Sequence, residues 1–156
     1  MPIWVDADAC PRPIKEIIFK AANRARVMTT LVANHAMSIP PSPFLQFKQV
    51  PGGFDVADNH IVESISHGDL VVTQDIPLAA LAVERKALAI NPRGQEYTPE
   101  SIRQRLAMRN LMEELRSTGV QTGGPDTFSN SDRKRFADAL DRWLQRRPDR
   151  DQKPGS

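Results

Sequence analysis

Residues 2–11 read PIWVDADACP, and this stretch decides the fold of the chain. A short apolar run is typical of a strand that is buried on both faces, as the strands of parallel sheets are. Asp6 ends the run, and Asp8 follows two positions later. Because ligands of open α/β sheets bind beyond the carboxyl ends of the strands, we expect a first strand over 2–6 with two acids at a functional edge.

A second apolar run, residues 70–75, reads LVVTQD and also ends in an acid, Asp75. If the two runs form neighbouring parallel strands, Asp6 and Asp75 point into one crevice. Carboxylates held this close repel each other, and a hard cation such as Mg²⁺ or Mn²⁺ relieves that repulsion. The sequence therefore predicts a metal-dependent enzyme.

The rest of the chain alternates between helical and strand patterns. Apolar residues at positions i, i+3 and i+4 indicate helices, and short β-branched runs indicate strands. These patterns predict helices over 11–25, 55–66 and 78–83, strands over 27–33, 45–50 and 87–90, and two C-terminal helices that begin near Thr98 and Ser129. The alternation is typical of an α/β three-layer sandwich with a central, mainly parallel sheet, here followed by C-terminal helices.

Length and composition limit the class of protein. A chain of 156 residues suits one domain, which we expect over 1–147, and the polar, proline-containing segment 148–156 reads as a flexible tail. The single cysteine, Cys10, excludes an internal disulfide and a multi-cysteine zinc site. No apolar stretch approaches the roughly 18 residues of a membrane span, so we expect a cytoplasmic protein without membrane contact. The net charge of +2 is too small to indicate nucleic-acid binding by itself.

Acids at the predicted edge are candidate ligands of Mg²⁺ or Mn²⁺, which prefer hard oxygen donors. The candidate metal ligands are Asp6, Asp8, Asp58 and Asp75, and the candidate catalytic residues are Asp6, Asp58 and Asp75. A helix N-cap explains Asp55 better than a metal site does. For Asp75, an N-cap and a metal site are equally good explanations. Asp58 has no such capping role if its helix begins near residue 55.

Three arginines are candidates for binding a substrate phosphate. Arg12 opens the first helix, Arg93 follows the last strand, and Arg133 opens the final helix. A solvated side chain is the alternative for Arg12, and an ion pair with a nearby acid is the alternative for Arg133. For Cys10, at the start of the first helix, a packing role is more usual than that of a nucleophile.

The acidic residues resemble the signature of PIN-like nucleases. In those nucleases an Asp after the first strand, an Asp on a mid-chain helix and a Thr-x-Asp after a later strand bind a divalent metal. The matching positions here are Asp6, Asp58 and Thr73 with Asp75. Nearly the whole chain is also similar to the uncharacterised bacterial YaiI/YqxD family. Its hallmarks resemble segments 6–11, 53–58, 73–79, 91–94, 122–125 and 128–136.

This resemblance implies a PIN-like fold and a metal-dependent nuclease that hydrolyses phosphodiester bonds of RNA or DNA. The chain lacks the helical glutamate expected around residues 35–45, and Pro77 stands where many PIN-like members have a fourth acid. Either Asp8 and Asp55 replace the missing acids, or the site is incomplete. Two alternatives therefore stay open. One is a non-catalytic regulatory module that binds nucleic acid or protein, and the other is a haloacid-dehalogenase-like phosphatase, which the pair Asp6 and Asp8 also suggests.

Overall fold

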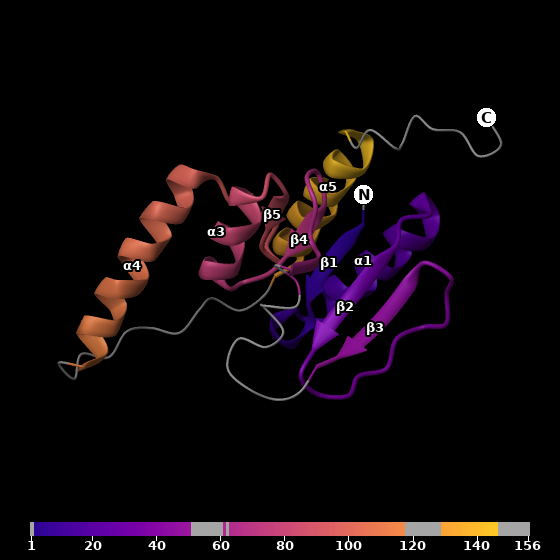
Figure 1. Cartoon of the computed structure of the whole chain (residues 1–156), viewed down its shortest axis with the longest axis horizontal. Coiled ribbons are helices and arrows are strands. Elements are labelled where there is room, and N and C mark those ends of the chain that lie inside the picture. Colours follow the sequence, from indigo (N-terminus) through magenta and orange to yellow (C-terminus); the bar gives the residue numbers. More distant parts are fainter. Residues whose placement is uncertain (1, 51–60, 62, 118–128, 147–156) are drawn as a thin grey trace.

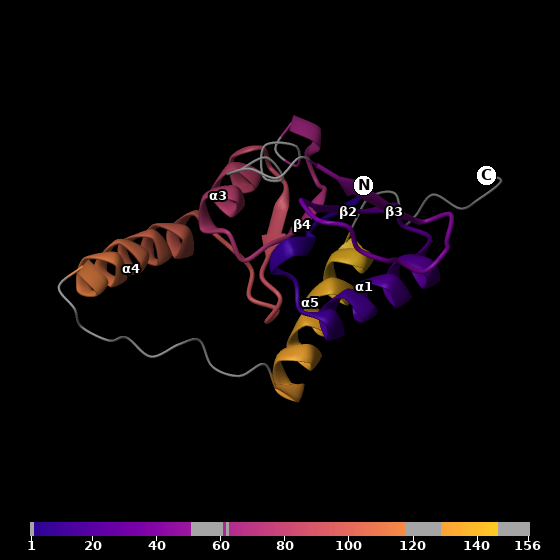
Figure 2. The same cartoon turned by 90° about the horizontal axis from the view of Figure 1, so that it is seen from below.

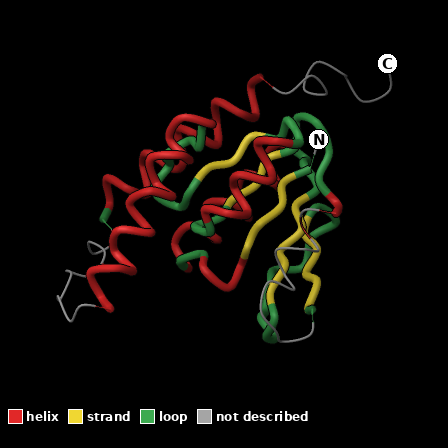
Figure 3. The backbone as a smooth tube through the Cα atoms, turned by 60° about the vertical axis from the view of Figure 1, so that its left-hand side comes forward, coloured by secondary structure: helices red, strands yellow, loops and turns green. Residues whose placement is uncertain are grey.

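The computed structural model describes residues 2–50, 61, 63–117 and 129–146 (Figure 1). Within these residues, five strands form one parallel sheet in the order β3-β2-β1-β4-β5. The strands are β1 Ile3–Asp6, β2 Thr29–Ala33, β3 Leu45–Gln49, β4 Leu70–Val72 and β5 Leu88–Ile90. They run side by side, as the yellow segments of Figure 3 show. The predicted α/β class and parallel sheet are confirmed.

Helices cover both faces of the sheet (Figure 2). The helices are α1 Arg12–Ala25, α3 Ile76–Glu84, α4 Pro99–Ser117 and α5 Asn130–Arg146, and a single 3₁₀ turn, Ala7–Ala9, joins β1 to α1. On one face α1 packs against α5, and on the other α3 packs against α4. The C-terminal helix α5 thus returns to the N-terminal half of the chain and completes the layer that α1 begins.

Alternation along the central strands builds two cores. In β1, Ile3 and Val5 are fully buried beneath α1 and α5, whereas Trp4 packs with the core on the opposite face. From the helices, Ile14 of α1 and Phe136 of α5 fill the first core. Burial on both faces explains why β1 and β4 appear in the sequence as unbroken apolar runs.

Among the side chains of α4 that the structure describes, those that belong to a core lie near its beginning. Ile102 is buried at 5% exposure, but Met108 is 54% exposed and Leu111 is 48% exposed. Figure 1 shows the helix running away from the sheet after its first turns. These described apolar residues of α4 are therefore divided between a packed beginning and exposed positions further along the helix.

Other predictions fall partly outside the described residues. The helix predicted over 55–66 is described as helical at Ile61, Glu63 and Ser64, and the predicted tail 148–156 lies outside the described residues. The remaining predicted helices and strands are confirmed with small shifts of their bounds, and β3 is an edge strand of the sheet. Across the described part of the chain, every helix is too short or too polar to cross a bilayer.

Candidate functional site

The strand order creates a switch point between β1 and β4. From β1 the chain passes through α1 to β2 on one side, and from β4 it passes through α3 to β5 on the other side. Where neighbouring strands lead in opposite directions, the carboxyl edge of the sheet opens into a crevice that commonly binds ligands. Asp6 is the last residue of β1, and Asp75 follows β4 by three positions. Both acids therefore lie at the edge where the sequence places a site.

Asp6 is a buried acid, with only 7% of its surface exposed. The Oγ1 hydroxyl of Thr73 donates a hydrogen bond of 2.9 Å to its Oδ2 atom. Burial raises the pKa of Asp6 above its ordinary value; the Thr73 bond acts against this, and the negative charges of Asp75 and Asp8 add to the rise. The two other acids are thus close enough for their charges to act on Asp6.

Thr73 connects the two acids. Its Oγ1 atom donates to Asp6 and accepts a hydrogen bond of 2.9 Å from the backbone N–H of Asp75. Its own carbonyl accepts a bond of 3.1 Å from the Tyr97 hydroxyl. The sequence indicated Thr73 only through its resemblance to the Thr-x-Asp of PIN-like nucleases. A threonine two positions before an acid is also a recognisable turn pattern, which is the signal that could have indicated this role. Because Thr73 is 1% exposed, it holds Asp6 and the Asp75 backbone in a fixed relation.

Asp75 caps helix α3, which is the alternative the sequence left open. Its Oδ1 atom accepts a hydrogen bond of 3.2 Å from the backbone N–H of Leu78. The cap uses one carboxylate oxygen only, so the role does not prevent the other oxygen from binding an ion. Within the described residues, neither Asp6 nor Asp75 forms an ion pair.

Asp8 lies in the 3₁₀ turn beyond β1 and bonds to the loop after β2. Its Oδ2 atom accepts a hydrogen bond of 3.0 Å from the backbone N–H of Asn34, and its Oδ1 atom lies 2.6 Å from His35 Nδ1. The sequence did not indicate His35 as a partner, because the loop 34–44 has no periodic pattern. Asp8 thus lies near Asp6 with both oxygens already engaged.

The fourth candidate ligand, Asp58, lies outside the described residues, as does Asp55. Among the residues that the structure does describe, no group of three acidic, histidine or cysteine side chains is placed to hold a metal ion. A site built from described residues would therefore use the Asp6 and Asp75 carboxylates and water.

Beside Asp8 there is a groove of about 640 Å³ between α1 and the loop after β2. Arg12, Lys15 and His35 contribute to its rim, and Phe19 and Met37 to its apolar wall. Arg12 is exposed and makes a loose ion pair of 3.7 Å with Glu16. Because His35 lines the groove and also contacts Asp8, the groove adjoins Asp8.

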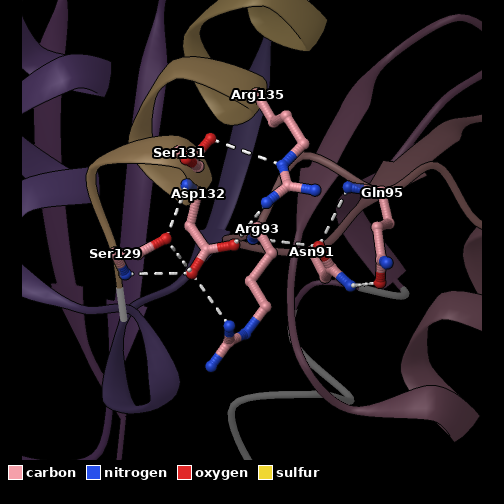
Figure 4. A network of polar contacts seen from close by, with 7 residues as sticks. All are labelled: Asn91, Arg93, Gln95, Ser129, Ser131, Asp132 and Arg135. Atoms are coloured by element: carbon pink, nitrogen blue, oxygen red, sulfur yellow. Dashed lines mark hydrogen bonds and ion pairs between the residues drawn. The ribbon is translucent and has the colours of Figure 1, made fainter. Parts of the chain in front are cut away.

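Arg93 lies where the β5–α4 turn meets α5 (Figure 4). Arg133 belongs to the first turn of α5. Arg93 Nη1 binds the buried carboxylate of Asp132 at 2.8 Å, and Arg133 is exposed and bonds to Asn130 Oδ1. The ion pair that the sequence suggested for Arg133 is thus formed by Arg93. The pKa of Asp132 is lowered most by a hydrogen bond from the backbone N–H of Ser129. The hydroxyl of Ser129 and the positive charges of Arg93 and Arg135 lower it further.

Cys10 is a packing residue in this structure. It is 7% exposed, and its Sγ atom donates a weak bond of 3.8 Å to the Pro11 carbonyl. Burial raises the pKa of the Cys10 thiol to about 12, so the thiol stays protonated at neutral pH. A nucleophile would need the thiolate, and the burial of Cys10 works against it.

Comparison with known proteins agrees with the resemblance that the motifs suggest. A family model described as "Uncharacterized BCR, YaiI/YqxD family" matches residues 4–146. The chain belongs to the YaiI/YqxD family. Among proteins similar to this YaiI/YqxD chain is a UPF0178 protein of Marinobacter nauticus, 66% identical over 146 residues, which are 94% of this chain and 97% of the relative.

Two further relatives extend the match. A UPF0178 protein of Dechloromonas aromatica is 61% identical over 148 residues, 95% of this chain and 99% of the relative. One of Aeromonas salmonicida is 60% identical over 144 residues, 92% of this chain and 96% of the relative. No solved structure matches the chain. The family match over residues 4–146 includes the switch point and its acids, Asp6 and Asp75.

Proposed function

We propose that this YaiI/YqxD chain is a Mg²⁺- or Mn²⁺-dependent hydrolase of phosphodiester bonds in RNA or DNA. One observation carries the proposal. A buried acid, Asp6, lies at the switch point under the influence of two further acids, and it has no cationic partner within the described residues. A fold retains such a destabilising arrangement where it serves a site, and a bound cation would relieve it.

The oxygen atoms of the site fit a small, hard cation. Within the described residues, the recorded hydrogen bonds of the two carboxylates use Oδ2 of Asp6 and Oδ1 of Asp75, which leaves one oxygen on each. Mg²⁺ is usually held by one or two carboxylates and several waters. Asp8 would assist through its charge, and Asp58 stays a prediction as a further ligand. The donor set is all oxygen, so it does not favour zinc.

The surroundings supply what phosphodiester hydrolysis needs besides a metal. A bound divalent ion would lower the pKa of a water and neutralise charge on the phosphate. Arg12 and Lys15, which line the 640 Å³ groove beside Asp8 together with Glu16, would offer two cations to a nucleic-acid backbone. The role predicted for Arg93 requires that its guanidinium bind phosphate while it is paired with Asp132.

One observation favours the rival, a non-catalytic module that binds nucleic acid or protein on the same fold. Asp75 caps α3 and Asp8 pairs with His35, so two of the acids already have a structural role. No comparable observation favours a haloacid-dehalogenase-like phosphatase. Such an enzyme needs Asp6 as an exposed nucleophile, and Asp6 is 7% exposed.

Melting curves with increasing Mn²⁺ test the proposal, on the wild type and on Asp6→Asn and Asp75→Asn. A ligand that binds only the folded state raises the melting temperature, so the wild type should gain stability, and both variants should lose that gain. Asp69→Asn is the matched control, because Asp69 is also a buried acid, 2% exposed, but precedes β4 at the opposite end of the sheet.

Cleavage of end-labelled single-stranded RNA and DNA in Mn²⁺ provides the second measurement. Activity should fall by roughly 10²-fold or more in Asp6→Asn, the usual cost of removing a group that stabilises transition-state charge. Asp69→Asn should retain it. A wild type that ignores Mn²⁺ in both measurements would refute the hydrolase and leave the binding module.

A further inference from the structure

A second pocket, of about 330 Å³, lies between β5 and the C-terminal half of α5. Its lining includes Gly68 and Lys86, which precede β4 and β5, so it opens near the amino ends of the strands. The acids Asp6 and Asp75 lie at the carboxyl ends, and neither lines this pocket. The pocket is therefore separate from the site of the proposed hydrolase and does not depend on it.

The wall of the pocket is apolar and fixed. Leu88 and Ile90 of β5 face Ala139 and Trp143 of α5. Trp143 is 5% exposed, and its indole Nε1–H donates a hydrogen bond of 3.2 Å to the Gly68 carbonyl, which holds the ring in place. Pockets of a few hundred Å³ with apolar walls and few polar groups are typical small-molecule sites.

The rim of the pocket is cationic. Lys86, Arg142 and Arg146 line it together with a single acid, Glu96. Arg142 and Arg146 are one helical turn apart on α5, so they share a face. Within the described residues none of these three cations forms an ion pair. Three positive charges against one negative charge favour an anionic ligand.

Lys86 provides an independent indication that the rim has a use. Its φ angle is 68°, in the left-handed region that glycine adopts without strain and lysine does not. A residue other than glycine is kept at a strained backbone position where its side chain is needed, and such residues gather at ligand sites. Lys86 lines the pocket, so the retained charge lies where an anion would meet it.

We propose that this pocket binds a small anion with an apolar body, of the class of medium-chain or aryl carboxylates. The apolar body would lie against Leu88, Ile90 and Trp143, and the carboxylate would meet Lys86 and Arg142 at the rim. A nucleotide fits less well, because the aliphatic wall would leave the polar edge of a base without hydrogen-bond partners.

Fluorescence of Trp143 measures the binding directly. The chain has two tryptophans, so Trp4→Phe leaves Trp143 as the only reporter. Decanoate should change its emission to saturation. Decanol, which has the same body without the charge, should bind at least tenfold more weakly, as should AMP and inorganic phosphate.

Variants of the full chain separate recognition from folding. In the Trp4→Phe background, Arg142→Gln and Lys86→Gly should each weaken decanoate binding about tenfold, the usual scale for a lost charge-assisted bond. Lys86→Gly also relieves backbone strain, so the variant should fold at least as stably as its parent. Arg26→Gly is the matched control, since Arg26 also has a positive φ, 56°, and lies outside the pocket.

The proposal is overturned by any of three results. These are the absence of a saturable change with decanoate, equal binding of decanol, and an unchanged affinity in Arg142→Gln. Tighter binding of AMP than of decanoate would also refute it, because the ligand would then be recognised by a base and not by an apolar body. Weakening in Lys86→Gly without weakening in Arg26→Gly supports it.

Discussion

Asp6 makes the stability of the fold depend on pH. Burial raises its pKa above the value of 3.8 that it has in the unfolded chain. As pH rises through 3.8, the unfolded chain therefore loses the Asp6 proton before the folded chain does. Stability falls over this interval until pH passes the raised pKa of the folded state, and the penalty is then constant.

Asp6→Asn should remove this penalty. Asparagine keeps the shape and an oxygen that can accept the Thr73 hydroxyl, but it carries no charge. Without added metal we expect the variant to be about 1 kcal/mol more stable than the wild type at pH 7, on the scale that relief of strained functional sites often yields. The difference should shrink as pH approaches 3.8. Urea unfolding at a series of pH values measures both.

Thr73→Val should change the free energy of unfolding in the opposite direction to Asp6→Asn. It removes the hydrogen bond that opposes the rise in the pKa of Asp6, so its destabilisation should be larger at pH 7 than near pH 4. A gap between Asp6→Asn and the wild type that stays the same across this range would show that the Asp6 charge does not limit stability.

The acids themselves could be predicted from sequence, but their partners could not. Asp6 and Asp75 each follow an apolar run, and parallel neighbours bring such positions to one edge. The direction of a side chain depends on contacts from distant segments, as with His35 beside Asp8. The same limit applies to Arg93, whose partner Asp132 is 39 positions away.

The turn between β5 and α4 is built to dock on α5. Asn91 Oδ1 accepts backbone hydrogen bonds from Arg93 and Gln95, at 2.9 and 3.0 Å, which closes the turn. Gly94 has a φ of 85° and lies directly against the backbone of α5. At the start of α5, Ser129 and Asp132 form a capping box, with Asp in place of the usual Glu.

Gly94→Ala should therefore break a contact between elements. A Cβ atom at this position would lie 2.4 Å from the Arg135 carbonyl carbon and 2.6 Å from the Phe136 nitrogen. Backbone cannot rotate away as a side chain can, so α5 would have to shift. We expect a loss of at least about 2 kcal/mol in the free energy of unfolding, including the cost of positive φ.

Gly68→Ala controls for that cost, because Gly68 has a φ of 88°. Chemical denaturation should show a clearly smaller loss for Gly68→Ala than for Gly94→Ala. Equal losses in the two variants would mean that φ strain alone explains the effect and that the turn is not docked tightly.

Helices and strands whose apolar residues follow one clear spacing could be predicted closely from the sequence. Helix α4 shows what this spacing does not predict. Its apolar residues Ile102, Met108 and Leu111 all suggested a buried face. Only Ile102 is buried, because the helix runs beyond the sheet that would cover the others. Periodicity reports which residues share a face, but not whether another element reaches that face.

At the scale of the whole molecule, α5 closes the fold. It packs beside α1 on the face of the sheet where Ile3 and Val5 of β1 are buried. The last described helix therefore covers the first strand. Phe136 is fully buried, and Leu140, Trp143 and Leu144 are 1%, 5% and 6% exposed. That residues 1–147 form one domain stays a prediction, which truncation of α5 tests.

A chain that ends at Arg135 should not fold. Burying each of the four apolar side chains of α5 contributes about 1.5–3 kcal/mol, so their total is comparable with the whole net stability of a small domain, about 5–15 kcal/mol. Their loss would also expose Ile14 and Ile18 of α1, which are fully buried here.

A chain that ends at Arg147 is the control, and removal of 148–156 should change stability by less than about 0.5 kcal/mol. Near-ultraviolet circular dichroism and urea unfolding distinguish the two chains. Adding a peptide of residues 129–147 to the shorter chain should restore part of the native signal, because what it lacks is packing. If the shorter chain instead unfolds cooperatively by itself, α5 is an appendage, and the single domain must be redrawn without it.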